Sequence, residues 1–427
     1  MVRREFIQKS AYGISSLPLL SALSNKNKTY RIVLIGCGWW GRNILREAIA
    51  FGQCKVVGLC DVDMTALHST LEEVTTLNGD KPALHRDFRV VILKKKPDIV
   101  IIGTPDHWHA LPAIEAMNAG AHIYLEKPIG HTIGEGQAIL RTARDTGRVC
   151  QVGTHRRVSP HNMSGIDFLR SGKVGKINHV KCFVNYGQGP GKATERMAIP
   201  QGLDWDFWLG PAQYQEYNNQ IHPKGFRHFL NFANGTIADW GIHWFDQVLW
   251  WTEERAPKRI FSTGNIFIRK DSADAPDTQM ASYEFEEFTL TWENRRCTPT
   301  AYLDHNVGAM FYGTEGSFHM GWLDGWTFYP RNKNKDIINM PPKLHAPDHQ
   351  NIKELWGDFI NSIETGQEAV CDILHGHLAT NISLLGMISY KLGRSIDWDS
   401  EHEMILNDSE ANALLKREYR GEWKYPT

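Results

Sequence analysis

Apolar and polar residues follow two different patterns along the chain. In the first, short apolar runs alternate with stretches whose apolar residues recur at helical spacing. The runs of strand character cover residues 30–35, 55–60, 99–103, 123–125 and 149–152. Residues 43–51 read as a helix with Ile44, Leu45, Ala48 and Ile49 on one face. Because alternating strands and helices form parallel sheets covered on both faces, this part predicts a doubly wound α/β domain.

The second pattern begins near residue 154, where the regular alternation stops. Residues 177–184 and 289–292 read as strands, and a turn at 313–316 precedes another strand at 317–320. Such segments predict an antiparallel sheet covered by helices, an α+β domain. The expected organisation is a leader and linker over 1–29, an α/β domain over 30–153, and an α+β domain with C-terminal helices over 154–427.

Three closely spaced glycines follow the first predicted strand, in the stretch RIVLIGCGWWGRN at residues 31–43. Gly36, Gly38 and Gly41 lie between a strand and a helix, which is the context in which this spacing binds a dinucleotide. The helix N-terminus then faces the pyrophosphate. Asp61 ends the next strand, twenty residues beyond Gly41, where a carboxylate can accept hydrogen bonds from the ribose hydroxyls and would repel a 2′-phosphate. The stretch therefore predicts an NAD site.

Two further loops follow predicted strands on the same sheet edge. One reads T-P-D-H-W-H at residues 104–109, and the other reads E-K-P at residues 126–128. Two histidines with one residue between them and no nearby third ligand make a metal site improbable, so no metal ligand is assigned. Lys127 is placed where an ammonium group can stabilise an alkoxide next to a nicotinamide ring.

A distant segment, D-W-G-I-H-W-F-D at residues 239–246, supplies candidate acid–base groups. Asp239, His243 and Asp246 recur at i, i+4 and i+7, hence on one face of a predicted helix over 238–251. A carboxylate can orient an imidazole for proton transfer. The alternative, a buried histidine satisfied by Asp239 and without chemistry, stays open on spacing alone.

Composition narrows the function classes. The chain has 427 residues, enough for two domains with their own cores, and a net charge of −1 that gives no field to attract nucleic acid. Its seven cysteines include no C-x-x-C pair, so neither a zinc ribbon nor a disulfide framework is indicated. Only three of the 15 tryptophans, Trp39, Trp40 and Trp108, precede residue 200. The later ones are either core residues or indoles that cover sugar rings, and both interpretations stay open.

The N-terminus has the layout of an export signal. Arg3 and Arg4 precede an apolar run of about a dozen residues that ends in small residues near Ser24. The run is too short to span a membrane. The paired arginines indicate a twin-arginine signal, which predicts an exported, periplasmic protein that folds before export and holds its cofactor tightly.

Together, GCGWWG, Asp61, T-P-D-H-W-H, E-K-P and D-W-G-I-H-W-F-D resemble the Gfo/Idh/MocA oxidoreductases, and the tail from residue 349 resembles the closing helix of that family. The family usually has T-P-N where this chain has T-P-D, at Asp106. The resemblance implies a Rossmann domain, NAD, a homo-oligomer (dimer or tetramer), and catalytic roles for Lys127, His243 and Asp239. The expected cofactor contacts are Gly36, Gly38, Trp39, Trp40, Gly41, Asp61, Thr104, Pro105, Asp106, His109, Glu126 and Lys127. The expected substrate contacts are His107, His155, Arg156, Trp240 and Asp246.

Three functions are compatible with these residues. The first is an NAD-dependent dehydrogenase of a secondary hydroxyl in a sugar or glycoside, with either His243 or Lys127 as the base. The second is a redox-neutral enzyme that keeps its cofactor, namely an NAD-dependent glycosidase or a sugar–sugar oxidoreductase. The third, a non-catalytic sugar or NAD sensor, is disfavoured because it would not need Lys127, His243 and Asp239 together. No nucleic acid and no membrane span are expected.

Overall fold

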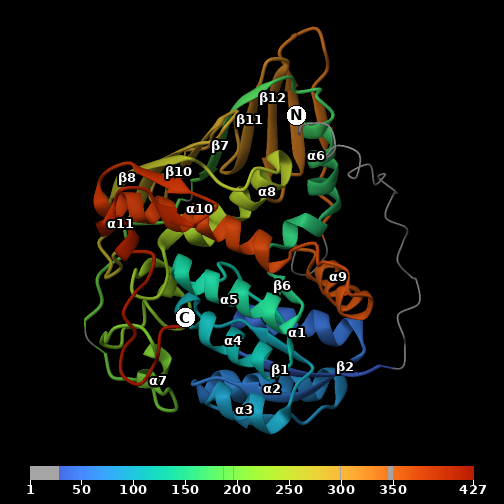
Figure 1. Ribbon diagram of the computed structural model, residues 1–427, viewed down its shortest axis with the longest axis vertical. Coiled ribbons are helices and arrows are strands. Elements are labelled where there is room, and N and C mark those ends of the chain that lie inside the picture. Colours follow the sequence, from blue (N-terminus) through green and yellow to red (C-terminus); the bar gives the residue numbers. More distant parts are fainter. Residues whose placement is uncertain (1–27, 186, 196, 299, 345–349) are drawn as a thin grey trace.

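The computed structural model describes residues 28–185, 187–195, 197–298, 300–344 and 350–427. The predicted leader, residues 1–27 of it, lies outside the described residues. Two sheets are stacked along the long axis, with the α/β part below and the larger sheet above in Figure 1. No helix within the described ranges combines the length and apolar character needed to cross a membrane.

The first sheet has six parallel strands in the order β3-β2-β1-β4-β5-β6. They are β1 (Tyr30–Ile35), β2 (Cys54–Cys60), β3 (Ala83–His85), β4 (Ile99–Ile102), β5 (His122–Leu125) and β6 (Cys150–Val152). The helices of this part are α1 (Trp39–Phe51), α2 (Met64–Asn78), α3 (Phe88–Lys95), α4 (Ala110–Asn118) and α5 (Ile133–Thr146). The predicted doubly wound sheet is confirmed; the sequence reading did not include β3, and it started α1 four residues late.

The order of the strands locates the binding edge. The chain runs outward from β1 to β3 and then returns to the other side of β1 with β4. At this reversal the loops after β1 and β4 diverge and leave a crevice at the carboxyl ends of the strands, where ligands of such sheets bind. Both predicted loops and the glycine turn lie at this edge.

The second sheet is ten-stranded and mostly antiparallel, in the order β14-β13-β12-β11-β7-β10-β9-β8-β15-β16. Its strands are β7 (Ile177–Val184), β8 (Arg259–Asn265), β9 (Thr278–Glu284), β10 (Thr289–Arg295), β11 (Val307–Gly313), β12 (Gly316–Gly321), β13 (Trp326–Pro330), β14 (Ile338–Met340), β15 (Ile396–Asp399) and β16 (Met404–Ile405). Within the described residues, β7 and β10 at the centre form the parallel pair of this sheet, and the neighbouring pairs are antiparallel. The predicted α+β domain is therefore confirmed as a mixed sheet.

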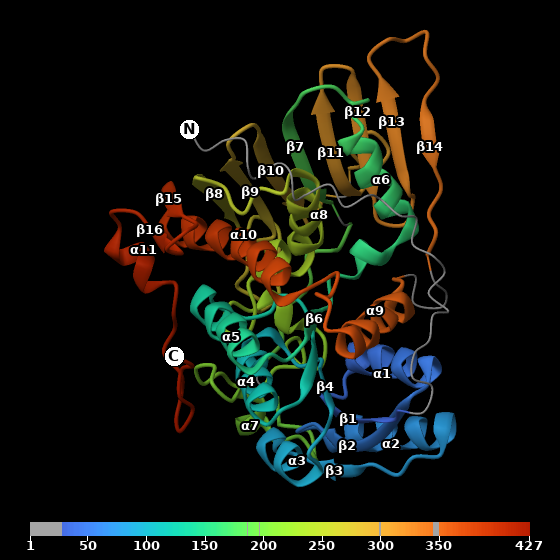
Figure 2. The same ribbon diagram turned by 45° about the vertical axis from the view of Figure 1, so that its right-hand side comes forward.

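Helices join the two sheets. They are α6 (Pro160–Arg170), α7 (Trp205–Leu209), α8 (Ile242–Thr252), α9 (Ile352–Thr365), α10 (Ile373–Leu392) and α11 (Ser409–Ala413). Figure 2 shows α10 crossing between the second sheet and α5, and α9 lying beside α1. Leu355, Trp356 and Phe359 of α9 belong to the same buried cluster as Leu34 and Ile44. The C-terminal part of the chain thus returns to the first sheet and fixes it against the second.

Candidate active site

The glycine turn leaves room for backbone rather than for side chains. Gly36 has φ +91°, and a Cβ there would lie 2.6 Å from the carbonyl carbon of Gly103. A Cβ on Gly41 would overlap the carbonyl oxygen of Gly36, whereas one on Gly38 would meet nothing within 4 Å. The first and third glycines therefore allow close packing, and the second faces open space. Since α1 has no side-chain N-cap, its terminal N–H groups remain available to an anion.

Asp61 is held at the end of β2 by the backbone. Its Oδ2 accepts a hydrogen bond from the amide of Cys37 at 2.7 Å, and its Oδ1 accepts one from the amide of Asp63 at 2.9 Å. Burial raises the pKa of the carboxyl group, although these two hydrogen bonds oppose that shift. Of the expected cofactor contacts, Gly36, Gly38, Trp39, Trp40, Asp61, Thr104, Pro105, Asp106, Glu126 and Lys127 line one groove.

The two other expected cofactor residues, Gly41 and His109, make contacts within the protein and do not line the groove. Gly41 packs against Gly36, as above. His109 is buried, with Nδ1 2.6 Å from the carbonyl oxygen of Pro128 and Nε2 2.9 Å from that of Thr104. It links the two ligand-facing loops and does not contact the groove itself. The Oγ1 of Thr104 is buried without a hydrogen-bond partner among the described residues, which fits a hydroxyl that bonds to the cofactor.

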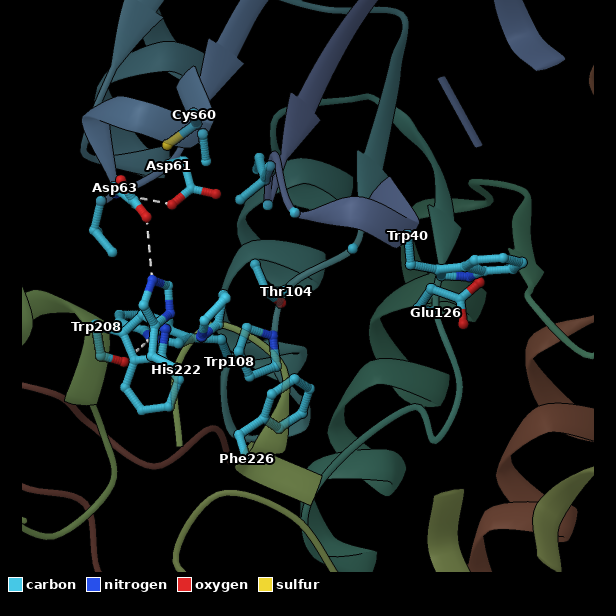
Figure 3. Close-up of a pocket in the computed structure, with 18 of the residues that line it drawn as sticks. Trp40, Cys60, Asp61, Asp63, Thr104, Trp108, Glu126, Trp208, His222 and Phe226 are labelled. Atoms are coloured by element: carbon cyan, nitrogen blue, oxygen red, sulfur yellow. Dashed lines mark hydrogen bonds and ion pairs between the residues drawn. The ribbon is translucent and has the colours of Figure 1, made fainter. Parts of the chain in front are cut away.

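A segment of the second domain covers the groove. Trp208, His222 and Phe226 line it from the side opposite Asp61, and Phe207 also belongs to the lining. Figure 3 shows the imidazole of His222 directed at Asp63, with Nε2 3.1 Å from Oδ2. Because Asp63 also caps α2 through its other oxygen, the contact joins the covering segment to a rigid element. The sequence analysis did not identify this cover, since its residues lie more than 100 positions from the glycine turn.

Two carboxyl groups in the groove have pKa values near neutral pH. Burial raises the pKa of Asp106 to about 7, against the opposing charges of Arg227 and Lys127. Burial also raises the pKa of Glu126 to about 7, and the backbone amide of Lys127 donates a hydrogen bond to its Oε2 at 3.1 Å. In Figure 3 the Glu126 carboxyl group lies against the indole of Trp40. Both groups are thus partly protonated at pH 7, which reduces the negative charge that they place next to an anionic dinucleotide.

A second cavity adjoins the groove. Its lining includes Trp39, Trp40, Glu126, Lys127, Gly153, His155, Lys224, Arg227, His228, Thr236, Asp239, Trp240, His243, Asn294, Arg296 and Trp322. The first four of these residues also line the groove. Lys127 therefore lies where a cofactor and a second molecule would meet.

Lys127 is fixed by Asp239. Its Nζ donates to the carbonyl oxygen of Asp239 at 2.7 Å and to Oδ1 at 3.0 Å, and the Nε of Arg227 is 3.0 Å from the same Oδ1. Burial opposes ionisation of Asp239, but the charges of Lys127 and Arg227 outweigh it and lower its pKa to about 2. Asp239 therefore remains an anion that holds the Lys127 side chain in place.

His243 contacts the cavity without the expected help from Asp239. Burial, the charge of Lys127 and the neighbouring His155 and Arg156 lower the pKa of His243 well below 6.5. Its Nδ1 has no hydrogen-bond partner within the described ranges, and its ring lies against those of Trp322 and His155, with centroids 4.9 and 5.3 Å away. The prediction that Asp239 orients His243 is wrong, because Asp239 bonds to the two cations.

Asp246 lies away from the cavity, which corrects its expected substrate contact. It is buried, and both of its oxygens accept hydrogen bonds from Nε of Arg157, at 2.9 and 3.0 Å. The π turn Ile237–Gly241 contains Asp239, whereas His243 and Asp246 both lie within the regular helix α8. Only Asp239 and His243 stay on the cavity side.

Two other expected substrate contacts are internal. His107 is buried with Nε2 3.0 Å from the carbonyl oxygen of Trp208, so it supports the covering segment. Arg156 is buried behind Trp322, with its guanidinium carbon 3.6 Å from the centre of the indole. His155 and Trp240, in contrast, do line the cavity.

The sequence analysis missed several cavity residues of the second domain, namely Arg227, His228, Arg296 and Trp322. Arg227 and His228 lie on the 3-10 helix Gly225–His228, Arg296 follows β10 and Trp322 follows β12, so no local spacing connects the three segments. The tryptophans divide between the two open interpretations. Trp244, Trp292 and Trp356 are fully buried, whereas Trp39, Trp40, Trp240 and Trp322 line the cavity.

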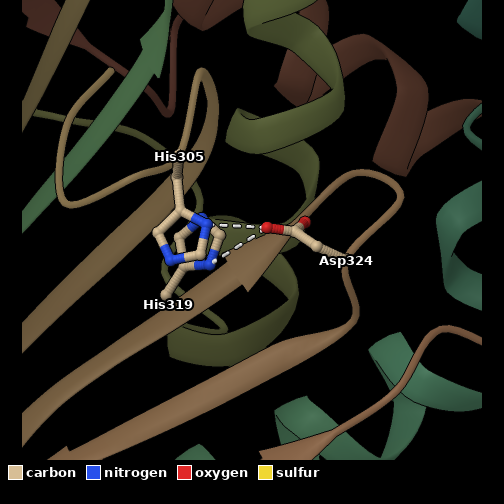
Figure 4. A group of neighbouring side chains, drawn as sticks. All are labelled: His305, His319 and Asp324. Carbon is tan, nitrogen blue, oxygen red and sulfur yellow. Dashed lines mark hydrogen bonds and ion pairs between the residues drawn. The ribbon is translucent and has the colours of Figure 1, made fainter.

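A group of potential metal ligands lies at the turn that follows β12. His305 Nδ1 is 2.7 Å from Oδ2 of Asp324, and His319 Nδ1 is 3.9 Å from the same oxygen (Figure 4). The two imidazole rings stack with centroids 3.5 Å apart. The His305–Asp324 hydrogen bond already satisfies these groups in part, and it braces the turn that carries Trp322.

Comparisons with known proteins agree with this geometry. A model of the oxidoreductase family's NAD-binding Rossmann fold matches residues 30–154, and one of that family's C-terminal alpha/beta domain matches residues 180–425. A glycosyl hydrolase family 109 protein of Shewanella pealeana is 29% identical over 202 residues, 42% of this chain and 44% of that protein. An alpha-N-acetylgalactosaminidase of Shewanella oneidensis is 25% identical over 169 residues, 39% of this chain and 37% of that protein. The chain thus matches less than half the length of these relatives.

Solved structures share the fold along most of the chain. An aldose-aldose oxidoreductase from Caulobacter crescentus, in complex with glycerol, has a TM-score of 0.65 at 16% identity and covers 87% of this chain and 100% of its own. The WlbA dehydrogenase of Bordetella pertussis, in complex with NADH and UDP-GlcNAcA, has a TM-score of 0.63 at 16% identity and covers 87% of this chain and 99% of its own. The groove built around Gly36 and Asp61 is the NAD site of this fold.

Proposed function

Because the chain belongs to the Gfo/Idh/MocA oxidoreductase family, we propose that it is an NAD-dependent enzyme that oxidises a secondary hydroxyl group of a sugar or glycoside. One observation carries the proposal: Lys127 lines both the NAD groove and the adjoining cavity, whose wall also carries His243. Bound NAD supplies the hydride acceptor, so that a secondary alcohol and NAD⁺ become a ketone, NADH and a proton.

Lys127 is assigned the stabilisation of negative charge on the substrate oxygen. Its two contacts with Asp239 limit the motion of the ammonium group. A fixed cation at a developing alkoxide lowers the barrier without reorganisation during the reaction. Asp239 is thus a positioning residue for Lys127, and Arg227 shares the charge of that carboxylate.

His243 is assigned the acceptance of the hydroxyl proton. A base must be unprotonated before the reaction, and the lowered pKa of His243 keeps the imidazole neutral at pH 7. Lys127 is less suited to this task, because its Nζ already donates two hydrogen bonds to Asp239. These two observations favour His243 over Lys127 as the base.

The choice of a carbohydrate substrate is supported by the cavity wall and by the relatives. Trp39, Trp40, Trp240 and Trp322 present flat indoles that can cover the apolar faces of a sugar ring. The similar proteins named above include sugar oxidoreductases and glycosyl hydrolases.

The test uses the protein as purified. Denaturation should release a dinucleotide identifiable by mass spectrometry, and incubation of the native protein with monosaccharides and glycosides plus an electron acceptor should yield a keto sugar. Lys127→Met should lose most turnover while still releasing the dinucleotide, and His402→Ala, at an exposed histidine, should match the wild type. Release of no dinucleotide, or equal keto-sugar formation by Lys127→Met, would contradict the proposal.

A redox-neutral reaction is the second candidate, and the covered groove favours it. The segment with His222 and Phe226 closes over the NAD site, which suits a cofactor that is retained through both halves of a cycle. The family 109 relatives carry glycosidase names. Hydrolysis of nitrophenyl glycosides without added NAD or acceptor would establish this candidate, whereas keto products formed only with an acceptor would support the dehydrogenase.

A further inference from the structure

The cavity beside Lys127 carries an excess of positive charge. Among the described residues that line it, the cations are Lys127, Lys224, Arg227 and Arg296, and the acids are Glu126 and Asp239. Asp239 is already shared by Lys127 and Arg227. Glu126, with a pKa raised to about 7 by burial, is only partly ionised at neutral pH. Two cations, Lys224 at the exposed rim and Arg296 on the wall, therefore have no acid in the lining to balance them.

Arg296 is the more unusual of the two. Its Nη1 contacts Nε2 of His228, a histidine that burial and neighbouring arginines keep neutral by lowering its pKa to about 3. The nearby Arg269 pairs with Asp271 at 2.6 Å, so that carboxylate is engaged. Within the described ranges no ion pair of Arg296 is found at 4.0 Å or less. Burial and the charge of Arg269 lower the pKa of Arg296 itself.

The preceding residue provides an internal comparison. Arg295, the last residue of β10, pairs with Glu293 of the same strand, Nε to Oε1 at 2.6 Å. Two consecutive arginines thus have different surroundings: Arg295 is paired with a carboxylate of its own strand, and Arg296 is partly buried at the cavity without an ion pair among the described residues. A partly buried cation without an acidic partner is costly, so its presence at a cavity indicates that a ligand supplies the missing anion.

We propose that Arg296 binds an anionic group of the substrate, so that the enzyme acts on acidic carbohydrates, in which the sugar carries a carboxylate or a phosphate. The inference rests on the proposed function, because it names the substrate class of the same cavity. A guanidinium forms paired, charge-assisted hydrogen bonds with either group. Lys224, exposed at the rim of both groove and cavity, adds to the field that attracts such a substrate.

Equilibrium binding to the NAD-loaded protein tests the inference without relying on turnover. Isothermal titration with D-glucuronate, D-glucose 6-phosphate and D-glucose distinguishes a carboxylate, a phosphate and a neutral sugar. We expect at least one of the two acidic sugars to bind about tenfold or more tightly than glucose, with an affinity that falls as salt rises. Arg296→Gln should reduce this preference about tenfold, and Arg296→Lys should retain part of it. Arg295→Gln should retain all of it.

The folding of the variants is measured in the same experiment. Because Arg296→Gln removes a buried charge without an acidic partner, its thermal midpoint should equal or exceed that of the wild type. Equal affinities for the three sugars, or equal loss of all affinities in Arg296→Gln, would overturn the inference. If glucose is oxidised without any preference for acids, the inference fails and the proposed function stands. If acidic sugars bind selectively and no hydroxyl is oxidised, the inference stands and the proposed function fails.

Discussion

The NAD groove and the adjoining cavity share Lys127, but each shifts the pKa of a carboxyl group in its wall in the opposite direction. In the groove, burial raises the pKa of Asp106 to about 7, because no cation bonds to it directly. In the cavity, burial also opposes the ionisation of Asp239, yet Lys127 and Arg227 contact it and its pKa falls to about 2. Direct contact with two cations, together with the greater exposure of Asp239, accounts for the difference in charge.

This difference matches what each space must bind. An anionic dinucleotide is accommodated more easily beside acids that can be protonated. The cavity instead needs a permanent anion, since Asp239 is what holds the ammonium of Lys127 at the junction. In the proposed function the two spaces thus have different roles. Backbone groups and acids with a pKa near 7 surround the cofactor, and paired charges position the reacting groups.

The largest expected effect comes from the cavity side, at His243. If its neutral imidazole accepts the proton, His243→Ala should lower kcat about 10²–10⁴-fold. In the wild type, kcat/KM should fall only on the acid side of pH 6.5, because the pKa of His243 is lowered, and this fall should vanish in the variant. The measurement is a pH–rate profile from pH 4 to 9. Lys127→Met should be slower but keep the acid limb; loss of the limb in Lys127→Met alone would make Lys127 the base.

The groove side makes a prediction about stability. The folded-state pKa of Asp106 is raised from 3.8 to about 7, so its protonated form stabilises the fold below pH 3.8. That contribution is lost as the pH rises through 7, a change of about 4 kcal/mol at most. Asp106→Asn should therefore flatten the decline in the free energy of unfolding between pH 4 and 8, measured by urea titration. Asp145→Asn, at an exposed position of α5, is the control. An unchanged slope in Asp106→Asn would contradict the contrast between the two acids.

The sequence predicted the groove far better than the cavity, for a physical reason. Gly36, Gly38 and Asp61 act through the backbone of consecutive elements, so their spacing carries the geometry. The cavity is built by tertiary contacts: Asp239 reaches Lys127 across 112 positions, and no periodicity records that.

The errors in the cavity have the same origin. The i, i+4, i+7 pattern put Asp246 on the same helix face as His243, but Asp246 is buried in a pair with Arg157, 89 positions away. Local spacing carries no signal of that partner. Likewise, β3 was missed because its three residues are only partly buried and form no apolar run.

The smallest effect is expected where the second domain closes the groove. His222→Ala removes the hydrogen bond to Asp63 and leaves the cap of α2 intact, because that cap uses the other oxygen of Asp63. A single partly exposed contact contributes about 1 kcal/mol, so the cofactor should dissociate about fivefold faster. Stopped-flow transfer of the released dinucleotide to a scavenging dehydrogenase measures this rate.

The KM for the sugar should stay constant, since His222 does not line the cavity among the described residues. His402→Ala breaks a comparable pair with Asp399 far from the groove and should change neither quantity. An increase in KM without faster dissociation would show that the covering segment serves the cavity, and the division between the two spaces would then fail.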